Sequence, residues 1–200
     1  MNEHADEFAI RRIIDDWAIF RDSAQFDRLL PLWHSDGQMV TTWSQVGAAE
    51  FVQRSKAAFE RGLSAIHQLC GTSVDISGER AIAQTKMVIS QRDKVDGVLC
   101  DAICTGRFYD FFEKRNGRWG IVLRQPIYEK DRLDPVDGSE HLSLDRKLLD
   151  SFPEGYRHLA YLQTKIGLTV NPHLPGLRGP EVAALYERGK KWLAGEGIEP

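Results

Sequence analysis

Four long stretches of strand-forming residues, separated by short turns, limit most strongly what this chain can fold into. They cover residues 65–76, 81–92, 98–112 and 118–128, and the breaks between them read SGE, KVDG and KRNG. In the last break, Asn116-Gly117 is typical of a tight β-hairpin turn. Consecutive strands joined in this way predict an antiparallel meander.

The segments before these strands predict mainly helices. Residues 7–22 carry apolar side chains at the spacing of one helix face, and further helices are expected at 25–34, where Pro31 bends or shortens the helix, and at 48–62. A short strand is expected at 37–43, and His34 and Asp36 are interpreted as a helix end that runs into a turn. Helices followed by a run of strands are typical of an α+β fold, not of alternating α/β structure.

The strands carry apolar residues at both odd and even positions. Within 118–128, one face is expected to hold Trp119, Ile121, Leu123 and Ile127, and the other Tyr128. This pattern predicts a curved sheet that wraps helices on one side and packs against a neighbour on the other.

The sequence pattern changes after residue 130, from strand-forming runs to a polar stretch and short helices. The stretch DRLDPVDGSE reads as a polar linker, and short helices are expected at 143–151, 154–166 and 180–194. We therefore expect one main domain over 1–130. Residues 131–200 are expected to form a helical extension that packs on this domain or on a partner chain.

Charge and hydropathy argue against several classes of protein. The net charge is −3, with 26 basic and 29 acidic residues well mixed, so the basic stripe typical of nucleic-acid binding is missing. No apolar run approaches the ~18 residues of a transmembrane helix. The start, MNEHADEFAI, is acidic and lacks the pattern of a signal peptide. We expect a cytoplasmic protein that binds neither nucleic acid nor membrane, with all three cysteines as small buried apolar residues.

The sequence shows no standard metal or nucleotide motif. H-x-H, H-x-x-x-H and C-x-x-C spacings are missing, and so are G-x-G-x-x-G, G-x-x-x-x-G-K-[ST] and G-x-S-x-G. We therefore expect no metal and no cofactor. What remains is acid–base chemistry by side chains.

Three short motifs make the chain similar to a known superfamily. They are DSAQFDRLLPLW (22–33), AIHQLCGT (65–72) and RWGIVLRQ (118–125). Over about residues 7–130 the chain resembles the SnoaL-like group of the nuclear transport factor 2-like superfamily. The resemblance implies a cone-shaped α+β barrel, in which a curved antiparallel sheet wraps N-terminal helices around a deep pocket.

Within that superfamily the motifs are most similar to those of scytalone dehydratases and hexachlorocyclohexane dehydrochlorinases. The resemblance implies catalytic roles for Asp22, His67 and Arg124, with Trp33 following Asp22 at the family's spacing. The dehydrochlorinases carry a lysine on the first helix where this chain has Trp17, which argues against a halide leaving group. Trp17, Trp33 and Tyr128 are the candidates for contact with substrate.

These residue types are chemically suited to acid–base catalysis. A histidine is a suitable base for a proton next to an activating group, and a carboxylate on its other ring nitrogen fixes the tautomer. A nearby arginine could stabilise an oxyanion or a departing group. The structural alternatives are that Asp22 caps the next helix in a capping box with Gln25, that His67 is a satisfied structural histidine, and that Arg124 forms an ion pair on the sheet.

Together, the residues and the resemblance predict a cofactor-independent lyase of the dehydratase type. Its substrate is expected to be a small apolar cyclic compound, either a hydroxy-carbonyl compound or an aromatic, polyketide or steroid-like one. Double-bond isomerisation begins with the same proton abstraction and stays an alternative. A second alternative is a non-catalytic ligand-binding or docking module, like the small subunit of a ring-hydroxylating dioxygenase. A homo-oligomer, dimer or trimer, is implied by the resemblance.

Overall fold

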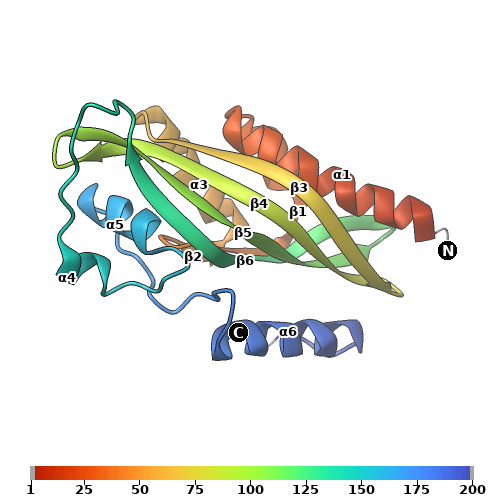
Figure 1. Cartoon of the computed structure of the whole chain (residues 1–200). Helices are drawn as coiled ribbons and strands as arrows, with labels where there is room; N and C mark the ends of the chain where they lie inside the picture. Colours follow the sequence, from red (N-terminus) through yellow and green to blue (C-terminus); the bar gives the residue numbers. More distant parts are fainter. Residues whose placement is uncertain (1–2, 199–200) are drawn as a thin grey trace.

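The computed structural model describes residues 3–198, in which helices come first, a long-stranded sheet follows and helices return at the end (Figure 1). The elements are α1 (Glu3–Asp22), α2 (Phe26–Leu29), the 3-10 helix η1 (Leu30–Leu32), β1 (Trp33–Val40), β2 (Gln45–Gly47), α3 (Ala48–Glu60), β3 (Ser64–Ser77), β4 (Arg80–Val95), β5 (Val98–Arg115), β6 (Arg118–Pro135), α4 (Arg146–Leu149), α5 (Arg157–Lys165) and α6 (Pro180–Leu193).

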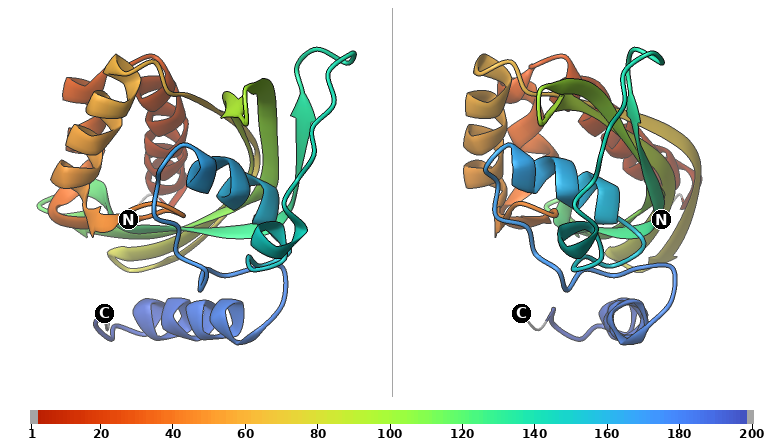
Figure 2. Two further views of the ribbon diagram at one scale, coloured as in Figure 1. Left: turned by 90° about the vertical axis from the view of Figure 1, so that its left-hand side faces the viewer. Right: turned by 60° about the vertical axis from the view of Figure 1, so that its left-hand side comes forward.

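The six strands form one sheet in the order β2-β1-β6-β5-β4-β3. All neighbours pair antiparallel except β1 and β6, which run parallel. The sheet curves strongly, and its two edge strands stay apart (Figure 2). The predicted α+β fold with a curved sheet is confirmed, and the sheet is an open cone rather than a closed barrel.

The predicted hairpin between β5 and β6 is confirmed. Arg115 pairs with Arg118 across the turn, and both turn residues adopt left-handed backbone conformations, with φ of 52° at Asn116 and 79° at Gly117. These are the conformations that a two-residue turn of this kind requires, and asparagine and glycine tolerate them best.

Helices α1 and α3 fill the concave side of the sheet (Figures 1 and 2). The apolar face of α1 is fully buried there through Ile10, Ile14 and Trp17. This helix lies mainly against β3, the strand that follows α3 in the chain. The contact brings the C-terminal end of α1 beside the start of β3.

A β-bulge at Val122 changes which side chains of β6 face the helices. Phe111 pairs with Leu123 while the next residue of β5 pairs with Ile121, so Val122 is an extra residue and the alternation reverses after it. Trp119 therefore belongs to the inner core, whereas Leu123 and Ile127 belong to a cluster on the outer face. The prediction that they share the face of Trp119 was wrong, because a bulge cannot be seen in one strand alone.

A second bulge lies at Glu129, between the pairs Thr105–Lys130 and Gly106–Tyr128. It turns the side chain of Asp131 inward, where it is completely buried. The strand continues to Pro135, so the first five residues of the expected linker are β-structure.

Three further expectations need correction. The helix expected at 25–34 ends at Leu32, because Pro31 converts its last turn to a 3-10 helix. His34 and Asp36 lie in strand β1 and not in a turn, and the His34 Nε2 contacts the Glu113 carbonyl at 2.8 Å. Cys70 is exposed, whereas Cys100 and Cys104 are buried as expected.

The C-terminal segment places helices on both sides of the sheet. Helix α5 lies at the open end of the concave side, and α6 lies on the convex side, apart from the other helices (Figure 2). Trp192 of α6 donates from Nε1 to the Phe112 carbonyl at 3.2 Å, and the Arg80 guanidinium lies 4.0 Å above its ring. The neighbour predicted for the outer face is thus the chain's own last helix. In residues 3–198 we find no helix with the length and apolar character to cross a membrane.

Candidate active site

Asp22 and His67 meet where the end of α1 touches the start of β3. His67 donates from Nδ1 to Asp22 Oδ1 at 2.7 Å, and its backbone N–H donates to Asp22 Oδ2 at 2.6 Å. One carboxylate therefore holds both the ring and the backbone of the histidine. The side chains are 9% exposed for His67 and 19% for Asp22.

Asp22 does not cap helix α2, which was the structural alternative for this residue. Gln25 occupies the N-cap position of α2 without a side-chain capping bond. Its amide nitrogen donates to the Ser23 hydroxyl, and its oxygen accepts from Arg28. Asp22 is the last residue of α1, and both carboxylate oxygens are directed to His67.

The surroundings of His67 favour the neutral imidazole. Its ring packs edge-on against Trp17, with centroids 5.0 Å apart, and lies 6.1 Å from Phe108. Burial lowers the pKa of His67 below its ordinary value, the Asp22 carboxylate acts in the opposite direction, and Arg21 and Arg124 add to the lowering. Because Nδ1 donates to the carboxylate, Nε2 is left unprotonated and free to accept a proton.

The His67 ring lines a small inner cavity of about 50 Å³. Within residues 3–198 its Nε2 has no hydrogen-bond partner, unlike its Nδ1. The wall is largely aromatic and apolar, and it includes Trp17, Phe108 and Tyr128. Apolar surroundings of this kind strengthen the action of a base and of nearby dipoles.

Another part of the inner cavity wall carries a chain of buried polar groups that sequence reasoning missed. The Thr42 hydroxyl donates to Gln163 Oε1 at 2.6 Å, and Gln163 Nε2 donates to Gln91 Oε1 at 2.9 Å. All three residues line the cavity. They come from the β1–β2 connection, β4 and α5, so no local motif could reveal them. Gln163 and Leu159 show that the C-terminal segment helps to build the cavity.

The predicted substrate-contact residues divide into two groups. Trp17 and Tyr128 line the inner cavity, and burial raises the pKa of the Tyr128 phenol, which keeps it protonated. Trp33 packs behind them against Trp17 and Phe51 and is not part of the cavity wall. The role predicted for Trp33 as a substrate contact stays a prediction.

Arg124 is fully buried and forms an ion pair, the alternative that the sequence left open. It donates from Nε and Nη2 to the two carboxylate oxygens of Asp110, both at 2.7 Å. Its guanidinium lies 4.4 Å from the ring centroids of Trp17 and Phe108, so it sits behind the cavity wall and not on it. Arg124 points into the core because the Val122 bulge reverses the alternation of side chains along β6.

A second aspartate–histidine pair repeats the geometry of the first. His158 of α5 contacts Asp131 through Nδ1 at 2.8 Å and through its backbone N–H at 2.6 Å, and the Leu159 N–H donates to the same carboxylate. The side chain of His158 is 25% exposed, and it does not line the inner cavity. This pair connects the start of α5 to β6, and no local motif predicted it.

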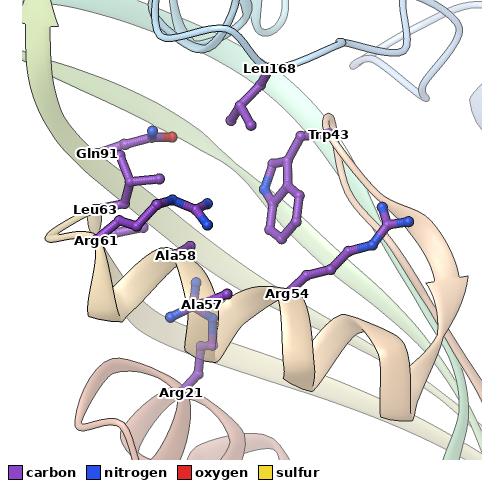
Figure 3. Close-up of a pocket in the computed structure, with 10 residues that line it drawn as sticks. Arg21, Trp43, Arg54, Ala57, Ala58, Arg61, Leu63, Gln91 and Leu168 are labelled. Atoms are coloured by element: carbon purple, nitrogen blue, oxygen red, sulfur yellow. The ribbon is translucent and has the colours of Figure 1, made fainter.

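A larger pocket of about 280 Å³ adjoins the inner cavity (Figure 3). We call it the vestibule; it shares Arg21, Trp43, Ala65 and Gln91 with the inner cavity. Arg21, next to Asp22 in the chain, was not singled out from the sequence. Among the residues that the structure describes, no group of three or more His, Cys, Asp or Glu side chains is arranged to hold a metal ion.

Comparison of the whole chain with curated proteins finds close relatives in fungi. A PEP2-like protein of Fusarium vanettenii is 36% identical over 97% of this chain and 88% of its own length. Pea pathogenicity protein 2 of the same organism is 35% identical over the same shares. These similarities extend through the C-terminal segment.

Solved structures share the fold at low sequence identity. A putative scytalone dehydratase from Novosphingobium aromaticivorans superposes with a TM-score of 0.54, at 14% identity over 72% of this chain and 96% of that one. A type-3 hexachlorocyclohexane dehydrochlorinase from Novosphingobium barchaimii gives 0.56, at 16% identity over 71% of this chain and 97% of that one. The family model for the SnoaL-like domain matches residues 2–125. The chain therefore belongs to the SnoaL-like family.

Proposed function

We propose that this protein is a cofactor-independent lyase of the dehydratase type, in which His67 is the general base. The observation that carries the proposal is the Asp22–His67 pair, because the His67 ring, whose Nε2 has no partner within residues 3–198, lines the inner cavity. A structural histidine needs no such free nitrogen beside a cavity. The solved dehydratase and dehydrochlorinase with the same fold support this class of reaction but do not define it.

The proposed reaction is loss of water from a cyclic hydroxy-carbonyl compound. His67 Nε2 takes the proton on the carbon next to the carbonyl group, and Asp22 stabilises the imidazolium that forms. The electron pair of the broken C–H bond forms the double bond as the C–O bond to the hydroxyl group breaks. The imidazolium returns its proton to the departing hydroxide, so the products are an unsaturated carbonyl compound and water.

The remaining roles follow from position. Tyr128 keeps its proton and lines the cavity, so we assign it as donor to the oxygen that gains negative charge. Trp17 lines the cavity, and we assign its ring as an apolar contact for the substrate. Arg124 is a positioning residue in this scheme, since it acts through the packing of Trp17 and Phe108 and not by contact.

The test compares two histidine substitutions of equal size. His67→Ala removes the ring but keeps the backbone bond to Asp22, and His158→Ala does the same at Asp131. Against a panel of cyclic hydroxy-carbonyl compounds, we expect His67→Ala to lose about 10²–10⁴-fold in kcat. We expect His158→Ala to keep its activity, because that ring does not line the cavity. Full activity of His67→Ala would refute the proposal.

The same assay separates the alternative functions. Mass spectrometry of the product distinguishes dehydration, which removes the mass of one water, from double-bond isomerisation, which leaves the mass unchanged. An isomerase would still need His67, because both reactions begin with proton abstraction. Ligand binding without turnover in the wild type, together with equal affinity in His67→Ala, would instead identify a binding module.

A further inference from the structure

The inner cavity is too small to hold a whole cyclic substrate. Its volume of about 50 Å³ compares with the ~30 Å³ that one water occupies in the liquid and with the ~300 Å³ or more typical of ligand sites. A substrate whose reacting carbon reaches His67 must therefore extend into the vestibule, which has about 280 Å³ and shares part of its wall. The side chains of the vestibule therefore indicate which chemical groups the other end of the substrate carries.

The vestibule is positively charged. Three arginines line it, namely Arg21, Arg54 and Arg61, and no acidic side chain does (Figure 3). Arg54 is already engaged, since it donates to Glu50 at 2.5 Å and to the Ser44 hydroxyl at 3.3 Å. Arg21 and Arg61 have neither a side-chain hydrogen bond nor an ion pair to any residue in 3–198.

Arg21 is the more unusual of these two. It is only 9% exposed, yet its guanidinium has no partner in the described part of the chain. Asp22, whose charge acts on Arg21, directs both of its oxygens to His67. Burial lowers the pKa of Arg21, and the Asp22 charge raises it. A buried cation without a paired anion is costly, so an anion in the vestibule would stabilise it.

The remaining walls suit a flat apolar body. The indole ring of Trp43 faces the space between the arginines, and Leu168 of the C-terminal segment closes one side (Figure 3). Alanine and leucine side chains from the end of α3, the start of β3 and the connection between them form a further part of the wall. Guanidinium groups bind planar carboxylates with two parallel hydrogen bonds, and aromatic rings stack on flat ligands.

We propose that the vestibule binds the carboxylate of a flat, mainly apolar cyclic substrate on Arg21 and Arg61, with the body of the substrate against Trp43. This rests on the proposed function only in calling the ligand a substrate. It narrows the substrate class to carboxylic acids whose reacting carbon lies at the end away from the carboxylate.

The test measures affinity for two probes of the same shape, 2-naphthoate and its neutral amide, by titration calorimetry at low salt. We expect wild-type protein to bind 2-naphthoate roughly tenfold or more tightly than the amide. Arg21→Gln and Arg61→Gln should each remove most of this preference. Arg132→Gln changes the net charge equally on an exposed side chain outside the vestibule and should leave the preference intact.

Three results would overturn the inference: equal or tighter binding of the amide, no binding of either probe at millimolar concentration, or an equal loss in Arg132→Gln. Arg61 is exposed, so its variant should fold even if Arg21→Gln does not. His67→Ala separates the two proposals, because it should retain the preference for 2-naphthoate while it loses turnover. If His67→Ala stays active and the preference holds, only the proposed function fails.

Discussion

Replacing Asp22 by asparagine should reverse the tautomer of His67. The carboxylate accepts two hydrogen bonds, from the His67 backbone N–H at 2.6 Å and from Nδ1 at 2.7 Å. An amide has one oxygen and one NH₂ group, so it accepts one of these bonds only. The backbone N–H is a fixed donor and should keep the oxygen. The NH₂ group then faces Nδ1, which becomes the acceptor, and the ring proton moves to Nε2.

The size of the effect follows from these two contacts. Hydrogen bonds to charged groups contribute about 1.5–3 kcal/mol, so Asp22→Asn should lower the free energy of unfolding by about that amount. For a chain of this length, this corresponds to a fall in Tm of about 3–12 °C. The fold should persist. The loss in kcat should be about 10²–10⁴-fold, as for His67→Ala, because Nε2 can no longer accept a proton.

The imidazole nitrogen shifts of His67, measured by NMR, give the tautomer without any substrate. In wild-type protein at neutral pH, we expect a protonated Nδ1 and an unprotonated Nε2, with the reverse in Asp22→Asn. The pKa of His67 should also fall further in the variant, because the carboxylate that raises it is gone while burial remains.

His158 serves as an internal control in the same spectra, since its bonds to Asp131 are not altered. A wild-type His67 that carries its proton on Nε2 would refute the assignment of Nε2 as the base. So would a tautomer that stays the same in Asp22→Asn.

Three other perturbations test the packing around the site. Asp110→Ala leaves Arg124 buried without its partner and should cost about 3–5 kcal/mol in urea unfolding; a loss below about 1 kcal/mol would contradict the buried pair. Gly189→Ala places a methyl group against the Tyr109 hydroxyl and should push α6 away from it. Burial raises the pKa of Tyr109 to about 12, so in the variant this pKa, followed by absorbance, should fall toward its ordinary value. An unchanged titration of Tyr109 would argue against close packing of α6. Burial lowers the pKa of His67 below 6.5, so the unfolded chain binds the imidazole proton more tightly than the folded chain does. The contribution of His67 to the free energy of unfolding should therefore be complete above pH 6.5 and be lost as the pH falls through the folded-state pKa. Thermal unfolding at several pH values should show this loss in wild type and less of it in His67→Ala, and equal curves would contradict it.

Some expectations stay predictions. The cytoplasmic location, the homo-oligomeric state and the roles assigned to Asp22, His67, Tyr128 and Trp17 await experiment. The division of the chain near residue 130 also stays a prediction, although α5 contributes Leu159 and Gln163 to the inner cavity. The three arginines that line the vestibule were not singled out from the sequence.

The sequence by itself determined the order of the elements and the α+β class. Periodicity within α1 and the Asn116-Gly117 turn are set by neighbouring residues, so they can be recognised locally. Asp22 and His67 were found through their spacing and the family resemblance, although 45 residues separate them in the chain.

Only the tertiary structure decided what surrounds this pair. The bulge at Val122 exists because two strands pair out of step, and it turns Arg124 into the core. Gln163 reaches the cavity because α5 packs into the open end of the curved sheet, and α6 covers the outer face. Arg21 has no partner within residues 3–198, because its neighbour Asp22 directs both carboxylate oxygens to His67. Such features depend on pairing and packing between distant segments, and the local pattern of a single sequence does not contain them.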